Sequence, residues 1–306
     1  MASSTLPSNG RLVNIGTHSL ALYTHGPEPK SSNDPVVLFI SGVASDALNW
    51  QAVVRKLGPS LRSYTYDRSG YHNSESSPLA PSAENVALEL SFLIEKAPIL
   101  NPLIFVGHSW AGVLTHEYFA LKGTGQIAGL VLVDANHETA PLVMDVDDPI
   151  LWNVIAAGVE PYAAWGVEAE HKLTQQEWDA FRAAEATEKF ELIMHKEDVE
   201  NYLPSFETLR KKELIYVIGG TRSRDWSGLY KAGVAKGNGT EKERLYVREL
   251  IKTVDAKNEG LMKEFLKLST KSELVFATES GHFVQMTQPE IVVDGVNWVL
   301  QNQPAV

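Results

Sequence analysis

The sequence contains no cysteine among its 306 residues. This absence excludes disulfides, a thiol nucleophile and thiolate metal sites, and it fits a cytoplasmic protein. Positive charge is also scarce, because 27 lysines and arginines stand against 38 acidic residues and leave a formal net charge of -11 at pH 7. We therefore expect neither nucleic acid nor an anionic membrane among the partners of this protein.

Features that mark several other classes of protein are missing as well. No apolar run is long enough to cross a bilayer. Residues 1–10 have neither a basic nor an apolar region, so we expect a short disordered leader and no signal peptide. The nine histidines form no H-E-x-x-H motif, and no phosphate-binding loop or dinucleotide fingerprint is present. We therefore expect no metal and no cofactor, while the oligomeric state stays open.

What is present is typical of a soluble globular protein. Hydrophobic residues make up 44% of the chain and charged residues 21%. The length suits one large α/β domain with an insertion, or two modest domains, with an extensive core.

Strand-like segments recur along the chain, at 36–40, 61–66, 103–106, 129–133, 214–218 and 273–277. Continuous apolar runs of this kind are typical of strands that are covered on both faces. Helical patterns separate most of these segments, as over Ser82–Ala97, and a hairpin over 11–23 precedes them. The alternation predicts an α/β fold in which helices flank a mostly parallel sheet.

The alternation is interrupted between residues 135 and 212. This stretch is rich in glutamate, alanine and aromatic residues, and Thr174–Glu177 has the form of a capping box. We interpret 135–212 as an inserted helical cap, or lid, and residues 1–134 with 213–306 as the core domain. The aromatic residues of this predicted cap either line a substrate pocket or form the core of the cap. They are Trp152, Tyr162, Trp165, Trp178 and Phe181.

Two further segments carry helix signals. The polar segment 221–271 predicts a loop tip at Gly237–Gly239 and a helix from about Glu241. Thr287–Glu290 has the form of a second capping box, which predicts the start of the last helix.

Ser109 lies between the predicted strand 103–106 and a helical pattern, with Gly107, Ala111 and Gly112 around it. A nucleophile elbow needs this arrangement, because a sharp turn exposes the serine hydroxyl and only small side chains fit beside it. The pentapeptide alone arises by chance in about one chain of this length in five. The strand before it and the helix after it therefore carry most of the evidence.

A serine hydroxyl is a poor nucleophile unless a base takes its proton. His282 lies in a loop just after the last predicted strand. The carboxyl ends of parallel strands meet along one edge of a sheet, so we expect Ser109, Asp134, Gly220 and His282 to converge there. We therefore interpret His282 as the base.

Five segments together resemble the α/β-hydrolase superfamily: Phe39–Val43, Tyr66–Gly70, Gly107–Gly112, Val131–Asp134 and Ser280–His282. The resemblance covers the chain except the predicted cap, and it implies the α/β-hydrolase fold. It implies Ser109 as the nucleophile, and His282 as the general base and later the general acid. The backbone N–H groups of Val43 and Trp110 would form an oxyanion hole.

The sequence departs from the family pattern at three places. Ser41 stands where histidine is usual, and Ala111 replaces a glycine; neither change removes a backbone donor. Most members carry the acid of the triad shortly after the strand that ends here at Gly220, where the nearest carboxylate is Asp225. A smaller branch, which includes haloalkane dehalogenases and zearalenone-type lactonases, carries it at the end of the preceding strand, here Asp134. We favour Asp134 and keep Asp225 as the alternative.

The resemblance thus implies a serine hydrolase that cleaves a carboxylic ester or lactone of a hydrophobic small molecule through an acyl-enzyme intermediate. The same scaffold also carries carbon–carbon bond hydrolases, lyases and non-catalytic ligand-binding proteins, and these alternatives stay open.

Overall fold

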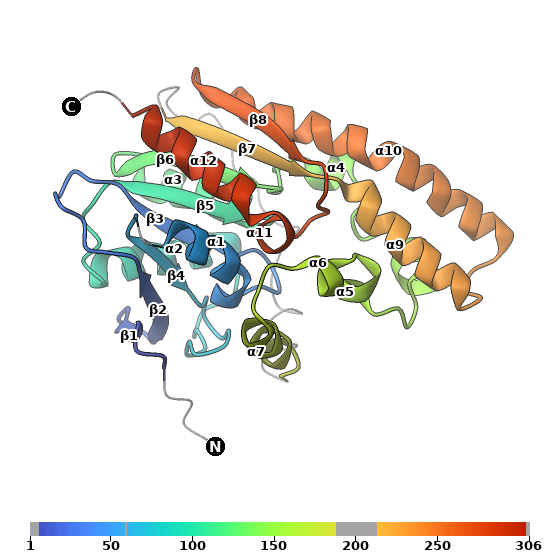
Figure 1. The fold of residues 1–306 in the computed structure, drawn as a ribbon, viewed down its shortest axis with the longest axis horizontal. Coiled ribbons are helices and arrows are strands. Elements are labelled where there is room, and N and C mark those ends of the chain that lie inside the picture. Colours follow the sequence, from blue (N-terminus) through green and yellow to red (C-terminus); the bar gives the residue numbers. More distant parts are fainter. Residues whose placement is uncertain (1–5, 59, 188–212, 304–306) are drawn as a thin grey trace.

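The computed structural model describes residues 6–58, 60–187 and 213–303, and its described strands form one eight-stranded sheet (Figure 1). The strands are β1 (Gly10–Asn14), β2 (Ser19–His25), β3 (Val36–Ile40), β4 (Ser63–Tyr66), β5 (Leu103–His108), β6 (Ile127–Val133), β7 (Leu214–Gly220) and β8 (Ser272–Ala277). Their order is β1-β2-β4-β3-β5-β6-β7-β8. Strands β3 to β8 are parallel, whereas β1 and β2 form an antiparallel hairpin at one edge. The predicted sheet is confirmed.

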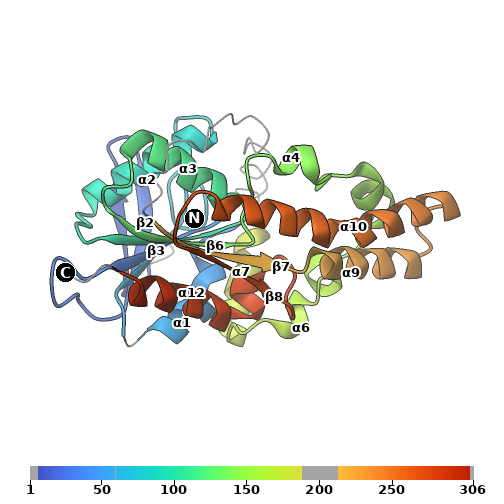
Figure 2. The same ribbon diagram turned by 90° about the horizontal axis from the view of Figure 1, so that it is seen from above.

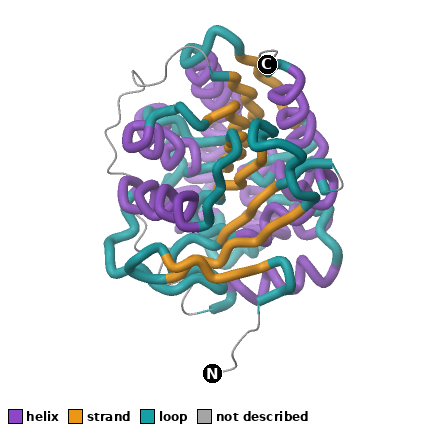
Figure 3. Tube along the Cα trace, turned by 90° about the vertical axis from the view of Figure 1, so that its left-hand side faces the viewer, coloured by secondary structure: helices purple, strands orange, loops and turns teal. Residues whose placement is uncertain are grey.

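Helices cover both faces of the sheet, as Figure 2 shows from above and Figure 3 from one end. Side chains of one strand point alternately to the two faces. In β3, Val37 and Phe39 join the cluster that contains Val53 and Val292, from α1 (Gln51–Leu57) and α12 (Pro289–Gln301). The other face of the sheet packs against α2 (Ala83–Lys96), α3 (Ala111–Lys122) and α10 (Glu241–Leu266). Because both faces are covered, every residue of β3 is buried.

The segment after β7 contains two helices, although the sequence predicted only the second. Helix α9 (Arg222–Ala235) precedes α10, and the two lie side by side and extend beyond the sheet (Figures 1 and 2). Helix α9 lacks a clear apolar stripe, because its buried face combines Trp226 and Leu229 with Asp225 and Gly233. In the described part of the chain, no helix has both the length and the apolar character that a membrane crossing requires.

The capping box predicted at Thr287 is wrong. Thr287 ends a separate short helix, α11 (Val284–Thr287), and its hydroxyl donates to the Phe283 carbonyl at 3.0 Å. Helix α12 begins at Pro289, and its N-cap Gln288 makes no side-chain capping bond. Proline has no N–H to cap and disfavours a helical residue before it, so the boundary falls at Gln288.

Short helices fill the described part of the segment between β6 and β7: α4 (Ala140–Val143), η2 (Ile150–Ile155), α5 (Pro161–Ala164), α6 (Val167–Glu170) and α7 (Gln175–Glu185). The capping box predicted at Thr174 is confirmed at the start of α7. Trp178 and Phe181 of α7 pack with Ala52 of α1 and Met286 of α11. Residues 188–212 of the predicted cap lie outside the described residues, and the division into core and cap stays a prediction.

Candidate active site

Ser109 lies in the turn between β5 and α3 with a φ of +57°, in the left-handed region that is unusual for a residue with a side chain. The residues around it leave no room for larger side chains. A Cβ on Gly107 would lie 3.0 Å from the Ala111 Cβ, and one on Gly112 would lie 2.4 Å from the Asn136 carbonyl oxygen. The small residues in the sequence motif are thus required by close packing around a strained serine.

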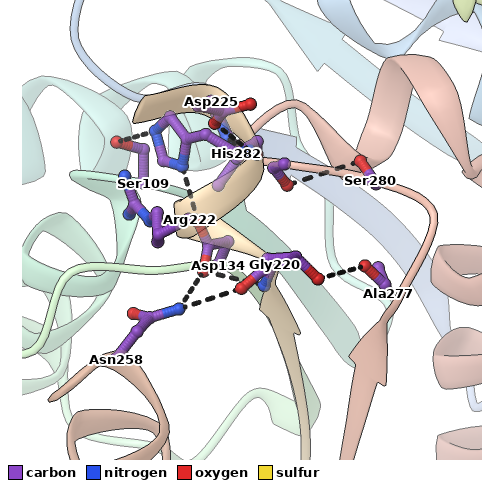
Figure 4. Close-up of polar contacts among 12 residues, drawn as sticks. Ser109, Asp134, Gly220, Arg222, Asp225, Asn258, Ala277, Ser280 and His282 are labelled. Atoms are coloured by element: carbon purple, nitrogen blue, oxygen red, sulfur yellow. Dashed lines mark hydrogen bonds and ion pairs between the residues drawn. The ribbon is translucent and has the colours of Figure 1, made fainter. Parts of the chain in front are cut away.

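The structure brings Ser109, His282 and Asp134 together from three widely separated parts of the chain (Figure 4). The Nε2 atom of His282 lies 3.0 Å from Ser109 Oγ, and Nδ1 of the same ring lies 2.7 Å from Asp134 Oδ2. Because a carboxylate accepts hydrogen bonds, Nδ1 carries the proton and Nε2 is left to accept from the serine hydroxyl. Both distances are within hydrogen-bonding range.

Asp134 is fully buried just after β6, and four groups surround its carboxylate. Oδ1 accepts from the Gly220 N–H and from Asn258 Nδ2, each at 2.9 Å. Oδ2 faces His282, and the same oxygen forms an ion pair with Arg222, whose Nε lies 2.7 Å from it. Burial alone would raise the pKa of Asp134, but Arg222 and the hydrogen bonds outweigh it and hold the pKa well below its ordinary value. Asp134 is therefore a carboxylate at neutral pH.

His282 is neutral at pH 7. Burial lowers the pKa of its imidazole and the nearby Arg222 charge lowers it further, whereas Asp134 acts in the opposite direction. A neutral imidazole is the form that can take a proton from Ser109.

The alternative acid, Asp225, meets His282 at a different atom. Its Oδ2 accepts a hydrogen bond of 2.7 Å from the backbone N–H of His282, whereas the ring Nδ1 is held by Asp134. Asp134, which the sequence favours, thus contacts the ring of His282, whereas the alternative Asp225 contacts its main chain.

The loop after β3 lies directly against the Ser109 turn. A Cβ on Gly42 would lie 2.7 Å from Ser109 Cβ and 3.2 Å from the backbone nitrogen of Trp110. Within the described residues, the backbone N–H groups of Val43 and Trp110 donate to no acceptor. Buried backbone donors are rarely unpaired in folded proteins, and of these two residues Trp110 is buried whereas Val43 is partly exposed.

Aromatic side chains border this site on the side of the segment between β6 and β7. Phe283 follows His282, and its ring centroid lies 5.6 Å from that of Trp165 and 5.5 Å from that of Tyr162. All three are only partly buried, in contrast to Phe181 in the core below. The predicted aromatic residues of the cap thus divide between core packing and a surface next to His282.

The sequence did not predict that Arg222 and Asn258 contact Asp134. Asn258 is a buried polar residue on the same side of α10 as Val254, Leu261 and Phe265, and its place in that apolar stripe was the available signal. Arg222 lies two residues after the end of β7, in the region where most members of the family carry the acid of the triad. No group of three or more potential metal-binding side chains occurs in the described ranges.

Residues 37–295 match the sequence model of the alpha/beta hydrolase family. A probable transporter of Hormonema carpetanum, efuK, is 30% identical over 98% of this chain, although the chain spans only 44% of that protein. An AB hydrolase superfamily protein of Gibberella zeae is 26% identical over 92% of this chain and 91% of its own length. A thermophilic esterase from Thermogutta terrifontis has the same fold, with a TM-score of 0.63 at 16% identity over 96% of this chain and 98% of its own. Because the family model spans most of the sequence, the chain belongs to the alpha/beta hydrolase family.

Proposed function

We propose that this protein is a serine hydrolase that cleaves a carboxylic ester or lactone of a hydrophobic small molecule through an acyl-enzyme intermediate. The observation that carries the proposal is the continuous hydrogen-bonded path from Ser109 Oγ through the His282 ring to Asp134. A serine, a neutral imidazole and a buried carboxylate in this order are the groups that nucleophilic acyl transfer requires.

In the first half of the reaction, Ser109 Oγ attacks the carbonyl carbon while its proton moves to His282 Nε2. Asp134 stabilises the resulting imidazolium and keeps the Nδ1 proton in place. His282 then donates the proton to the departing alkoxide. The acyl group stays bound to Ser109 as an ester. In the second half, water attacks this ester while His282 takes a proton from it. His282 then returns the proton to Ser109 Oγ as the carboxylic acid product leaves.

The two unpaired N–H groups described above provide a place for the negative charge that develops on the carbonyl oxygen. Donors held ready by the fold stabilise such an oxyanion because they need not reorient during the reaction. Val43 and Trp110 would therefore bind the oxyanion through their backbone nitrogens, as the family resemblance implies. Ser41 does not interfere with this role, since its hydroxyl is engaged with the Asp46 carbonyl and the Trp50 indole nitrogen.

The aromatic surface beside His282 supports a hydrophobic substrate. Partly exposed Tyr162, Trp165 and Phe283 offer apolar contact area close to the reacting groups.

The proposal is tested with p-nitrophenyl esters of increasing acyl length, a set of aliphatic and aromatic lactones, and a fluorophosphonate probe. Wild-type protein should hydrolyse at least one of these classes and become labelled at Ser109. Ser109→Ala should lose both activities and keep its fold, because the side chain contributes little to the core. Ser91→Ala, which changes a buried serine of α2, is the matched control and should behave as the wild type.

Full activity of Ser109→Ala would refute the assignment of the nucleophile. Labelling at Ser109 with turnover of β-diketones but of neither esters nor lactones would instead place the protein among carbon–carbon bond hydrolases. Failure of the probe to label Ser109, together with no turnover, would contradict an enzymatic role.

A further inference from the structure

The loop that carries His282 is fastened to the first turn of α9. The Thr221 N–H donates to the Ser280 carbonyl at 2.9 Å, and Arg224 Nη1 donates to the Glu279 carbonyl at 2.9 Å. The third and shortest contact is the 2.7 Å bond from the His282 N–H to Asp225. Among the three, only this bond involves the main chain of the histidine itself.

His282 is held from the opposite side by His108. The Nε2–H of His108 donates to the His282 carbonyl at 2.9 Å, and burial keeps the pKa of His108 well below its ordinary value, so the donor is a neutral imidazole. The backbone N–H and C=O of His282 are therefore both bonded to buried side chains. Such anchoring leaves the imidazole little freedom beyond rotation about its own side-chain bonds.

Asp225 also packs directly against the residue before His282. A Cβ on Gly281 would lie 1.8 Å from Asp225 Oδ1 and 2.3 Å from its Cγ, so no other residue fits there while Asp225 keeps its place. The carboxylate and the glycine form one close contact on which the path of the loop depends.

The position of Asp225 is unfavourable for an ionised carboxyl group. Burial raises the pKa of Asp225 to about 7, and the neighbouring Asp134 adds to the rise, whereas the His282 N–H and Arg222 lower it. A carboxyl group held in such a place destabilises the fold when it ionises, and groups of this kind concentrate at functional sites.

We propose that Asp225 is a positioning residue, which fixes the main chain of His282 so that the imidazole stays within reach of both Ser109 and Asp134. This inference rests on the proposed serine-hydrolase function and adds a second carboxylate to it, with a role distinct from that of Asp134. Asp225 acts through the His282 backbone and takes no proton from the ring. A displacement of the ring by about 1 Å is enough to lower the rate on the order of 100-fold.

The experiment compares Asp225→Ala and Asp225→Asn with Asp255→Ala as the control. Asp255 also anchors α9, because it accepts from the Ser223 N–H at 2.8 Å, but it does not contact His282. Four quantities are measured: kcat and KM on the best p-nitrophenyl ester, the rate of fluorophosphonate labelling at Ser109, and the downfield NMR resonance of the His282 Nδ1 proton.

Asp225→Ala should lower kcat and the labelling rate by about 10- to 100-fold with KM nearly unchanged, and it should weaken or broaden the Nδ1 resonance. Asp225→Asn keeps an oxygen acceptor for the His282 N–H and should retain most of the activity. Asp255→Ala should leave all four quantities near the wild-type values. If Asp225→Ala does not fold, Asp225→Ser replaces it, because its shorter side chain stops before His282.

Labelling and an Nδ1 resonance unchanged in Asp225→Ala would overturn the proposal. So would a loss in Asp225→Asn as large as that in Asp225→Ala, because Asp225 would then act through its charge. Failure of the proposed function is recognised separately, as wild-type protein that neither turns over substrate nor labels at Ser109. The Nδ1 resonance still reports on the role of Asp225 in that case.

Discussion

Arg222 and His282 approach the same oxygen atom, Oδ2 of Asp134, each at 2.7 Å. The histidine makes a hydrogen bond with this oxygen, whereas Arg222 Nε has no hydrogen-bond partner in the described part of the chain and forms an ion pair. A permanent positive charge thus lies next to the carboxylate that would stabilise the imidazolium. Its two effects oppose each other, because Arg222 keeps Asp134 ionised but disfavours a second positive charge on His282.

Replacement of Arg222 by methionine should move the acidic limb of the kcat/KM profile to higher pH. In the proposed mechanism His282 must be unprotonated, and Arg222 is the second cause, after burial, of the lowered pKa of His282. Without that charge the pKa rises and a more alkaline solution is needed to free the imidazole. A pH–rate profile from pH 4 to 9 measures the shift, with Arg248→Met on α10 as the control. A limb that stays in place or moves to lower pH would show that Arg222 does not set the basicity of His282.

Asp134→Asn should reduce kcat by about 10³- to 10⁴-fold. The asparagine amide can present N–H groups to His282 Nδ1, which favours the tautomer whose proton is on Nε2 and which cannot accept from Ser109. Steady-state kinetics measure the loss, and Asp294→Asn on the exposed side of α12 is the matched control. Near-normal kcat in Asp134→Asn would exclude Asp134 as the partner of the base.

Gly42→Ala should lower kcat/KM by at least about 100-fold, because the new methyl group would lie 2.7 Å from Ser109 Cβ and 2.8 Å from the His108 carbonyl oxygen. The crowding should also destabilise the protein by about 1–3 kcal/mol. Gly260→Ala is the contrasting change, since nothing lies within 4 Å of a Cβ at this helical glycine. It should leave activity unchanged and stabilise α10 by roughly 0.5–1 kcal/mol. Chemical unfolding and ester kinetics test both, and equal activity of the two variants would contradict the close fit at Gly42.

The sequence allowed the sheet to be predicted because its strands are continuous apolar runs, which reflect burial on both faces. The 36–40 run was predicted with the bounds that β3 has. The same logic placed Ser109, Asp134 and His282 at one edge, since the carboxyl ends of parallel strands must lie together. Chain order and periodicity therefore carry this part of the site.

The contacts that hold the site could not be predicted in the same way. Asn258 lies far along α10, and only the packing of that helix against β7 brings its amide to Asp134. Asp225 was recognised as a carboxylate near the site, but whether it would reach the ring or the backbone of His282 depends on where α9 begins. The start of α9 was not predicted because Thr221, although threonine is a common N-cap residue, is followed three positions later by Arg224, so the sequence contains no capping box there.

Asp225→Asn should stabilise the protein above pH 7 relative to its effect at pH 4. The folded-state pKa of Asp225 is raised from an ordinary 3.8 to about 7, so its favourable contribution to folding is complete below pH 3.8 and is lost as the pH rises through 7. Asparagine does not ionise and escapes this loss, which amounts to at most about 4 kcal/mol. Any pH-independent effect of the amide cancels when unfolding free energies of the two proteins are subtracted at each pH. Urea unfolding at pH 4 and pH 8.5 should therefore show a difference that increases with pH, and a constant difference would mean that Asp225 ionises as readily in the folded protein as in the unfolded chain.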